Sequence, residues 1–259
     1  VIYEGLADLP REANSGGEAL TGRGLSLPYI LYVGNAYPHK NLEQLIRAFF
    51  EIKKDKPDLQ LVLVGKRDYF SKRLEQEIKG KYLQFGAQYP KDIIFFGFAT
   101  DQELVTLYKH AELYVFPSLM EGFGLPPLEA LSFDLPVVCS DIPVLHEILG
   151  NGVLYFDPKD TNNMKEVIRG ALYNTEKQVK LLEESKKILR RYSWKKNVEE
   201  TLEVYKGCKI SRKSIATSSQ QRHLEPVLGR GNLITETVIP HAVRGEAKDG
   251  DAGSPEEKV

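Results

Sequence analysis

Six short apolar runs alternate with helical patterns along this chain, and that alternation restricts the fold. The runs lie at residues 29–34, 59–65, 93–97, 112–117, 136–140 and 152–156. They are almost continuous in apolar residues, which is typical of strands buried on both faces of a parallel sheet. The alternation predicts an α/β fold with a Rossmann-like, doubly wound parallel sheet.

The segments between the runs have the periodicity of amphipathic helices. The first of them collects its apolar side chains on one face, namely Leu42, Leu45, Ile46, Phe49 and Ile52. Asp101 is expected to cap the helix that follows the third run. Two longer helical patterns, 176–192 and 193–206, follow the last run. Residues 11–26 read as a loose linker and residues 207–259 as a low-order, polar tail.

Composition excludes several classes of protein. The 259 residues are 42% hydrophobic and 27% charged, with a net charge of -1, so the overall charge does not indicate a nucleic-acid surface. Cys139 and Cys208 are too few for a disulfide framework, which favours a reducing compartment. No apolar run approaches the roughly 20 residues of a membrane span. The first residues lack both a signal-peptide pattern and a methionine, so we expect a fragment or a processed product.

The stretch "MEGFGLPPLEA", residues 120–130, follows the fourth run and predicts a ligand site. Gly122 and Gly124 allow a tight turn, and the double proline after them suits the start of a helix. A helix N-terminus favours an anion such as phosphate. Glu129, expected in the first helical turn, can accept hydrogen bonds from the diol of a ribose, and Glu121 from a second sugar. The pattern therefore predicts a nucleotide-sugar.

Three cations follow the first two apolar runs and are candidates for binding a diphosphate. Lys40 is expected at the start of a helix, and Lys66 and Arg67 come directly after a strand glycine. For Lys66 and Arg67, a solvated surface role is an equal alternative.

Four other polar residues have simpler interpretations. We expect His39 and His146 on helix surfaces rather than as bases, and Cys139 in the core. Ser118 can either approach the ligand or cap the turn.

These residues resemble the C-terminal, donor-binding domain of GT-B glycosyltransferases of family 4, which are retaining enzymes. Glu121 and Glu129, eight positions apart, match the E-x(7)-E motif of that family. Residues 115–148 follow the pattern of the family almost throughout, and the resemblance covers about 27–206. Residues 1–26 would then be a remnant of the strand and linker between two domains, and 207–259 a tail.

The resemblance implies roles for individual residues. Glu121 and Lys40 would be catalytic, with Glu121 on the donor hexose and Lys40 neutralising the diphosphate as it leaves. Glu129 would hold the ribose. The remaining donor-binding positions would be Gly122, Phe123, Gly124, Leu125, Gly34, Asn35, Lys66, Arg67, Gly97 and Phe98.

The resemblance also implies what the chain works with. The donor would be a nucleotide-diphosphate hexose, with mannose favoured, and the chain would need no metal and no cofactor. The acceptor, a glycan or a lipid-linked sugar, would bind through an N-terminal domain that this sequence does not contain. We expect a cytoplasmic location, with peripheral association at the inner face of the membrane as an open alternative.

Three features depart from the family or depend on its missing half. Asn35 stands where many members carry an arginine, and Asp134 where many carry a glycine in a left-handed turn, a conformation that aspartate tolerates. In complete members the last helix packs on the N-terminal domain, so its apolar face here, at Trp194, Val198, Leu202 and Tyr205, is expected to lack that partner.

Alternative functions stay open from the sequence. The chain can be a non-catalytic nucleotide-sugar-binding module or an inactive fragment. Another GT-B chemistry, an epimerase or a phosphorylase, is a further alternative, although no lysine is marked for a pyridoxal cofactor. A dinucleotide-dependent dehydrogenase is the weakest, because no G-x-G-x-x-G follows the first run.

Overall fold

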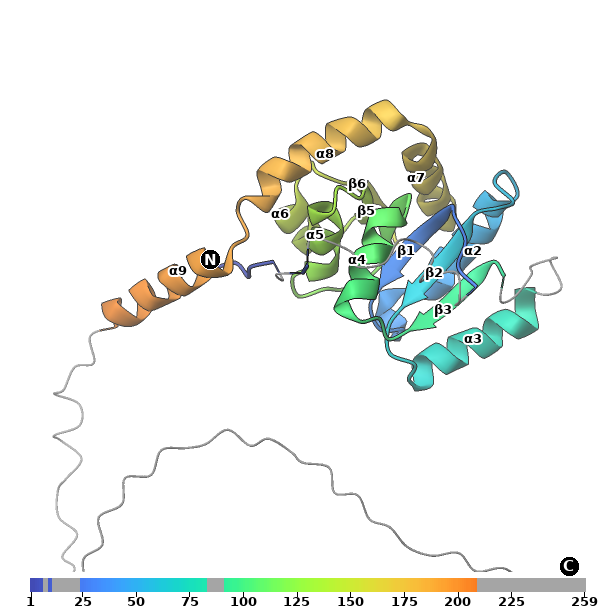
Figure 1. Ribbon diagram of the computed structural model, residues 1–259, viewed down its shortest axis with the longest axis horizontal. Coiled ribbons are helices and arrows are strands. Elements are labelled where there is room, and N and C mark those ends of the chain that lie inside the picture. The colour runs from blue at the N-terminus through green and yellow to red at the C-terminus, as the bar shows by residue number, and fades with distance from the viewer. Residues whose placement is uncertain (7–8, 11–23, 83–90, 209–259) are drawn as a thin grey trace, which may run out of the picture. The chain divides into compact units, whose positions relative to one another are not determined.

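The computed structural model describes residues 1–6, 9–10, 24–82 and 91–208 (Figure 1). The strands are β1 (Tyr29–Val33), β2 (Gln60–Val64), β3 (Ile93–Gly97), β4 (Leu113–Phe116), β5 (Val137–Ser140) and β6 (Leu154–Phe156). The helices are η1 (Pro38–Lys40), α2 (Leu42–Lys53), α3 (Tyr69–Tyr82), α4 (Asp101–His110), α5 (Leu125–Ser132), α6 (Pro143–Leu149), α7 (Thr161–Tyr173), α8 (Thr175–Leu189) and α9 (Trp194–Gly207). Each apolar run identified in the sequence forms one of these strands.

The six strands form one parallel sheet in the order β3-β2-β1-β4-β5-β6. This confirms the prediction of a doubly wound α/β fold. The order reverses between β1 and β4, and ligands of such folds bind at this reversal, beyond the carboxyl ends of the strands. The loops after β1 and β4 therefore occupy the position where a site is expected.

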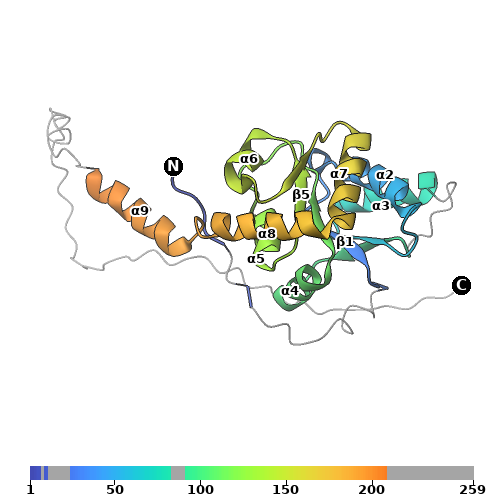
Figure 2. The same ribbon diagram turned by 90° about the horizontal axis from the view of Figure 1, so that it is seen from above.

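Helices cover both faces of the sheet, as right-handed crossovers require. The helices α2, α3 and α7 lie on one face, and α4, α5 and α6 lie on the other (Figures 1 and 2). The apolar face expected for α2 is buried in full, including Leu45, Ile46, Phe49 and Ile52 at 0% exposure. A sheet whose two faces are both covered explains why the strands are apolar without alternation.

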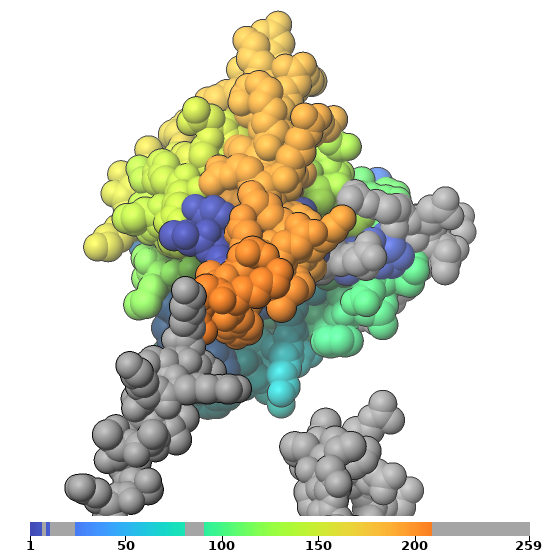
Figure 3. All heavy atoms as spheres, turned by 90° about the vertical axis from the view of Figure 1, so that its left-hand side faces the viewer, coloured from blue at the N-terminus to red at the C-terminus, as the bar shows by residue number. Residues whose placement is uncertain are grey.

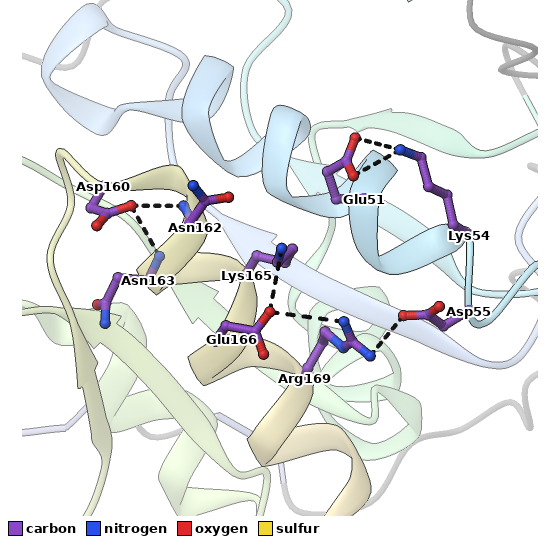
Figure 4. A network of polar contacts seen from close by, with 9 residues as sticks. All are labelled: Glu51, Lys54, Asp55, Asp160, Asn162, Asn163, Lys165, Glu166 and Arg169. Carbon is purple, nitrogen blue, oxygen red and sulfur yellow. Dashed lines mark hydrogen bonds and ion pairs between the residues drawn. The ribbon is translucent and has the colours of Figure 1, made fainter.

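Polar contacts at the surface join α7 to the end of α2 (Figure 4). Arg169 of α7 pairs with Asp55 at 2.9 Å, and Glu166 contacts both Lys165 at 3.3 Å and Arg169 at 3.8 Å. The Asp160 carboxylate caps α7 by accepting from two backbone amides of its first turn, at 2.8 and 3.1 Å. Surface pairs of this kind contribute about 0–1 kcal/mol each, so they add little to the stability of the fold.

Two local predictions about helix and turn ends have different outcomes. Thr100, not Asp101, caps α4, because the Thr100 hydroxyl accepts from the Glu103 amide while the Glu103 carboxylate accepts from the Thr100 amide at 2.8 Å. This reciprocal capping box satisfies two backbone donors, whereas Asp101 as the cap would satisfy one. Asp134 has the expected left-handed backbone, with φ of 57°.

The N-terminal residues lie beside α9 (Figure 3). Asn197 donates to the Tyr3 carbonyl at 2.8 Å, and Trp194 packs against Gly5. Residues 1–6 and 9–10 form no strand, contrary to the strand expected there, since none of the described strands pairs with them. Residues 11–23 and 209–259 lie outside the described part, so the linker and tail assigned to them remain predictions.

The apolar face of α9 is exposed. Trp194, Val198, Leu202 and Tyr205 are 49%, 52%, 48% and 69% exposed. Within the described part of the chain, no element buries this face. Whether it has a partner elsewhere stays a prediction. Among the helices that the structure describes, none has both the length and the hydrophobicity of a membrane span.

Candidate functional site

The loops after β1 and β4 are fastened to each other at the reversal of the sheet. The Leu119 amide donates to the His39 carbonyl at 2.7 Å. The Asn41 side-chain amide donates to the carbonyls of Pro117, at 3.1 Å, and Pro158, at 2.8 Å. Asn41 has a left-handed backbone with φ of 59°, which asparagine tolerates better than most residues. Asn41 was not among the site residues predicted from the sequence. An asparagine directly before the start of a helix is the signal for such a turn.

Lys40 and Glu121, predicted from separate motifs, meet in this site. The Lys40 Nζ lies 2.6 Å from Glu121 Oε1, and the two side chains are only 14% and 10% exposed. The Lys40 ammonium also lies 5.6 Å from the centre of the Phe116 ring. The ion pair keeps both charges compensated in a site with little water, where an unpaired charge would be costly.

Glu129 lies on the same side of the sheet, on α5. The Tyr108 hydroxyl donates to Glu129 Oε2 at 3.1 Å. Burial raises the pKa of the Glu129 carboxyl, and the nearby Asp101 carboxylate also raises it, while the hydrogen bond from Tyr108 lowers it. Glu129 is half-buried, and no hydrogen bond to its Oε1 is found within the described ranges. That oxygen is available to a ligand hydroxyl.

Of the two glycines in the turn before α5, only Gly124 has a conformation that favours glycine. Gly124 has φ of 101° and precedes the helix, which begins at Leu125 with no side-chain cap. A Cβ at Gly124 would also lie 2.9 Å from Leu145. Gly122 is exposed with open space around it, so neither its backbone nor its surroundings require glycine.

The position of Glu129 corrects one expectation. It is the fifth residue of α5 and not part of the first turn, because the left-handed Gly124 lets the helix begin at Leu125, ahead of both prolines. The ring of Phe123 packs between Tyr3 and Tyr192, at centroid distances of 6.3 and 5.7 Å. Only the backbone of Phe123 is therefore suited to line a ligand.

The glycines that end β1, β2 and β3 let three loops approach one another closely. The Gly34 amide donates to Val64 at 2.9 Å, and the Gly65 amide donates to Gly97 at 3.0 Å. A Cβ at Gly65 would overlap the Gly34 carbonyl. Gly97 has φ of 83°, a left-handed conformation that favours glycine.

The remaining predicted residues lie around these glycines and differ in their contacts. Arg67 pairs with Glu75 of α3, so it is already engaged by a carboxylate. Lys66 is exposed, and we find no ion pair for it in the described part of the chain. Phe98 is 77% exposed beyond β3. The Asn35 carbonyl accepts from the Tyr32 hydroxyl at 2.7 Å, and its side-chain oxygen accepts from the Tyr37 amide at 3.3 Å.

The other polar residues considered from the sequence are His146, Cys139, Ser118 and His39. The ring of His146 lies half-exposed, 2.7 Å from Asp141 Oδ1 and stacked on Tyr155. Cys139 is fully buried in the sheet, as expected, and burial raises the pKa of its thiol. The buried Ser118 hydroxyl has no hydrogen-bond partner among the described residues. His39 is half-buried beside Tyr37. Its contribution to the site is the backbone carbonyl that accepts from the Leu119 amide.

A metal site is not evident in the part of the chain that the structure describes. No group of three or more His, Cys, Asp or Glu residues there could hold a metal ion. The expectation of a reaction without metal or cofactor stays a prediction.

The comparison with known families decides the relationship of this chain. Residues 22–188 match the family Glycosyl transferases group 1 over more than half of the chain. The chain belongs to this family. The prediction made from the E-x(7)-E motif and its surroundings is thereby confirmed.

Two of the relatives of this chain are bacterial mannosyltransferases. The O-antigen chain mannosyltransferase RfbU of Salmonella typhimurium is 37% identical over 142 residues, which are 54% of this chain and 37% of that protein. The O-antigen chain mannosyltransferase B of Escherichia coli is 30% identical over 179 residues, which are 69% of this chain and 45% of that protein. The chain thus spans less than half the length of these relatives.

Solved structures share the fold. Sucrose-phosphate synthase from Thermosynechococcus elongatus superimposes with a TM-score of 0.64 at 24% identity, over 84% of this chain and 53% of that one. The Anabaena protein HepE, in complex with UDP and glucose, gives a TM-score of 0.64 at 18% identity, over 74% and 51%. Each match covers about half of the larger protein, in agreement with the predicted half of a GT-B fold.

Proposed function

We propose that this chain is the donor-binding half of a retaining hexosyltransferase that uses a nucleotide-diphosphate sugar. The observation that carries the proposal is the meeting of Lys40 and Glu121 next to the uncapped start of α5, with Glu129 one helical turn further on. A cation and a helix N-terminus suit a diphosphate, and two carboxylates suit the sugars on either side of it.

Each residue has a defined task in this proposal. Lys40 leaves Glu121 for the diphosphate and stabilises the negative charge that develops on it as the glycosidic bond breaks. Glu121, released, accepts hydrogen bonds from hexose hydroxyls. Glu129 binds the ribose through Oε1 while Tyr108 holds Oε2. The exposed Lys66 adds a second positive charge, whereas Arg67 stays with Glu75.

The hexose and the acceptor follow from the named relatives. Both bacterial relatives are called O-antigen chain mannosyltransferases, which supports mannose as the transferred sugar. We infer that the acceptor is a glycan or lipid-linked sugar bound by a further N-terminal domain, at the cytoplasmic face of the membrane. The reaction needs no metal, because Lys40 and the start of α5 compensate the diphosphate. No named relative here supports the alternative of a non-catalytic module.

A calorimetric panel tests the proposal. The chain is titrated with GDP-mannose, UDP-glucose and ADP-glucose, and with mannose 1-phosphate as a control that has a hexose and one phosphate but no nucleoside. We expect saturable one-to-one binding of at least one nucleotide-sugar, with a Kd of about 1 mM or below, and at least tenfold weaker binding of the control. If none of the three binds more tightly than mannose 1-phosphate, the donor-site assignment is wrong.

A further inference from the structure

A cavity of about 340 Å³ lies next to the candidate donor site and shares Asn41 with it. Residues of α2 and α3 form its sides, and Ala36, Tyr37, Pro38 and Asn41 complete it. We call it the α2–α3 groove. Ala36 and Leu42 also line the small cavity at the ends of β1, β2 and β3, so the groove adjoins the candidate donor site from its outer side. Its volume falls within the about 300–1,000 Å³ of typical small-molecule sites.

Aromatic rings form one part of this groove. Tyr37 and Phe70 meet edge to face with centroids 5.0 Å apart, and Tyr37 is 41% exposed. Tyr69, 70% exposed, packs on Phe70 from outside at 5.4 Å. Partly exposed rings at a concave surface offer a flat apolar face to a ligand.

Charged side chains form the helical sides, and their charges cancel. Arg73 pairs with Glu77 at 2.9 Å on α3, and Arg47 lies 3.9 Å from Glu43 on α2. The four groups carry two positive and two negative charges. The groove therefore provides planar donors and acceptors without a net attraction for anions.

A side-chain amide adds a neutral donor to the same groove. Gln44 Oε1 accepts from the Thr161 hydroxyl at 2.6 Å, which fixes the orientation of the amide. No partner of its NH₂ group is found in the described ranges of the chain, so this group is available to a ligand hydroxyl.

We propose that the α2–α3 groove binds a neutral oligosaccharide. Carboxylate, guanidinium and amide groups together can both donate to and accept from neighbouring sugar hydroxyls, and the aromatic rings can pack on the C–H face of a pyranose. A phosphate or a nucleotide fits less well, because each arginine already has its own carboxylate. That the oligosaccharide is part of the growing glycan rests on the proposed function, whereas the groove itself does not.

Chemical-shift mapping on the full chain tests this site. The ¹⁵N-labelled protein is titrated with an α-linked mannose tetrasaccharide and, separately, with the nucleoside diphosphate of the nucleotide-sugar that binds most tightly in the panel above. We expect the tetrasaccharide to shift the amides of Tyr37, Gln44 and Phe70, and to leave those of Gly124 and Glu129 in place. Shifts confined to Gly124 and Glu129, or no saturable shift at all, would overturn the proposal.

Two variants that change different parts of the groove sharpen the test. Tyr37→Ala removes an exposed ring, and the double variant Arg73→Ala with Glu77→Ala removes a partly exposed pair without changing the net charge. Each should weaken tetrasaccharide binding about fivefold or more while nucleoside diphosphate affinity stays within twofold. Unchanged tetrasaccharide affinity in both variants contradicts the groove. Tetrasaccharide binding that persists without nucleotide binding would leave the groove intact and refute only the donor site.

Discussion

Glu129 illustrates how a single side chain meets two opposing demands. Its carboxylate must be ionised to accept two hydrogen bonds from a diol, yet its half-buried position and the nearby Asp101 both raise its pKa. The hydrogen bond from Tyr108 acts in the other direction. Tyr108 is itself buried and stacked on Phe133, so it holds the Glu129 carboxylate in a fixed orientation.

Replacing Tyr108 by phenylalanine tests this balance. Since the folded protein raises the pKa of Glu129, its proton is taken up at a higher pH than for an exposed glutamate, and donor affinity falls as the pH decreases through that value. Tyr108→Phe removes the interaction that lowers the pKa, so the fall should begin at a still higher pH. Calorimetric titration of the nucleoside diphosphate between pH 5 and 8 measures this pH dependence of affinity. The variant Glu129→Gln, which cannot ionise at this position, shows how much of the dependence comes from ionisation of the phosphate. Identical pH profiles of wild type and Tyr108→Phe would rule out this role.

Of the glycines that end β1, β2 and β3, Gly65 is the one whose added Cβ would meet backbone atoms rather than a side chain. A Cβ there would overlap the Gly34 carbonyl, and neither backbone can move without breaking the hydrogen bonds that join the strand ends. Gly65→Ala should therefore lower the free energy of unfolding by at least about 2 kcal/mol. Gly170→Ala, in open space on α7, is the matched control and should raise it by about 0.5–1 kcal/mol. Urea denaturation distinguishes the two, and equal effects would show that the close approach is absent in solution.

Asn41 connects three elements of the site, η1, the loop after β4 and the loop after β6. Asn41→Gly keeps the left-handed backbone accessible and removes only the two hydrogen bonds to Pro117 and Pro158, so it should cost about 1–3 kcal/mol of stability. Asn41→Ala should cost about 1 kcal/mol more, since alanine pays for the left-handed conformation. Thermal or urea unfolding of both variants measures the difference. A smaller loss in the alanine variant than in the glycine variant contradicts this account.

The helices and strands could be predicted where the local sequence determines them. Their exact ends could not, because these depend on which side chain reaches which backbone amide. The apolar strands and the buried face of α2 follow directly from the sequence, as does the left-handed turn at Asp134. The starts of α4 and α5 were placed one or more residues off, because a capping box at Thr100 and the backbone of Gly124 set them. Caps depend on which side chain reaches which amide, and several candidates in a row look alike in sequence.

The candidate site depends on the arrangement of the whole sheet. The sequence predicted Lys40 and Glu121 separately, but their contact joins residues 81 positions apart and arises from the pairing of β1 with β4. The engagement of Arg67 by Glu75 and the clamp made by Asn41 were likewise hidden, because both depend on tertiary placement. Sequence patterns identified the residue types of the site, and the strand order brought them together.

The exposed face of α9 gives a prediction for the molecule as a whole. If no part of this chain covers the face, then Val198→Gln together with Leu202→Gln should change the free energy of unfolding by less than about 0.5 kcal/mol. Leu45→Gln, in the buried face of α2, is the matched control and should cost more than about 3 kcal/mol. Urea denaturation measures both. A loss of over 1 kcal/mol in the α9 variant would mean that the chain itself packs against this helix.

The most direct measurement of the central claim is the calorimetric affinity for the nucleoside diphosphate of wild type, Glu129→Ala and Glu183→Ala. Glu183 is an exposed glutamate on α8, so its variant controls for the loss of one carboxylate. We predict that Glu129→Ala weakens binding about tenfold or more, as expected for lost hydrogen bonds to a charged group, while Glu183→Ala binds like wild type. Equal affinity of all three proteins would contradict the assignment of Glu129 to the ribose and, with it, the proposed donor site.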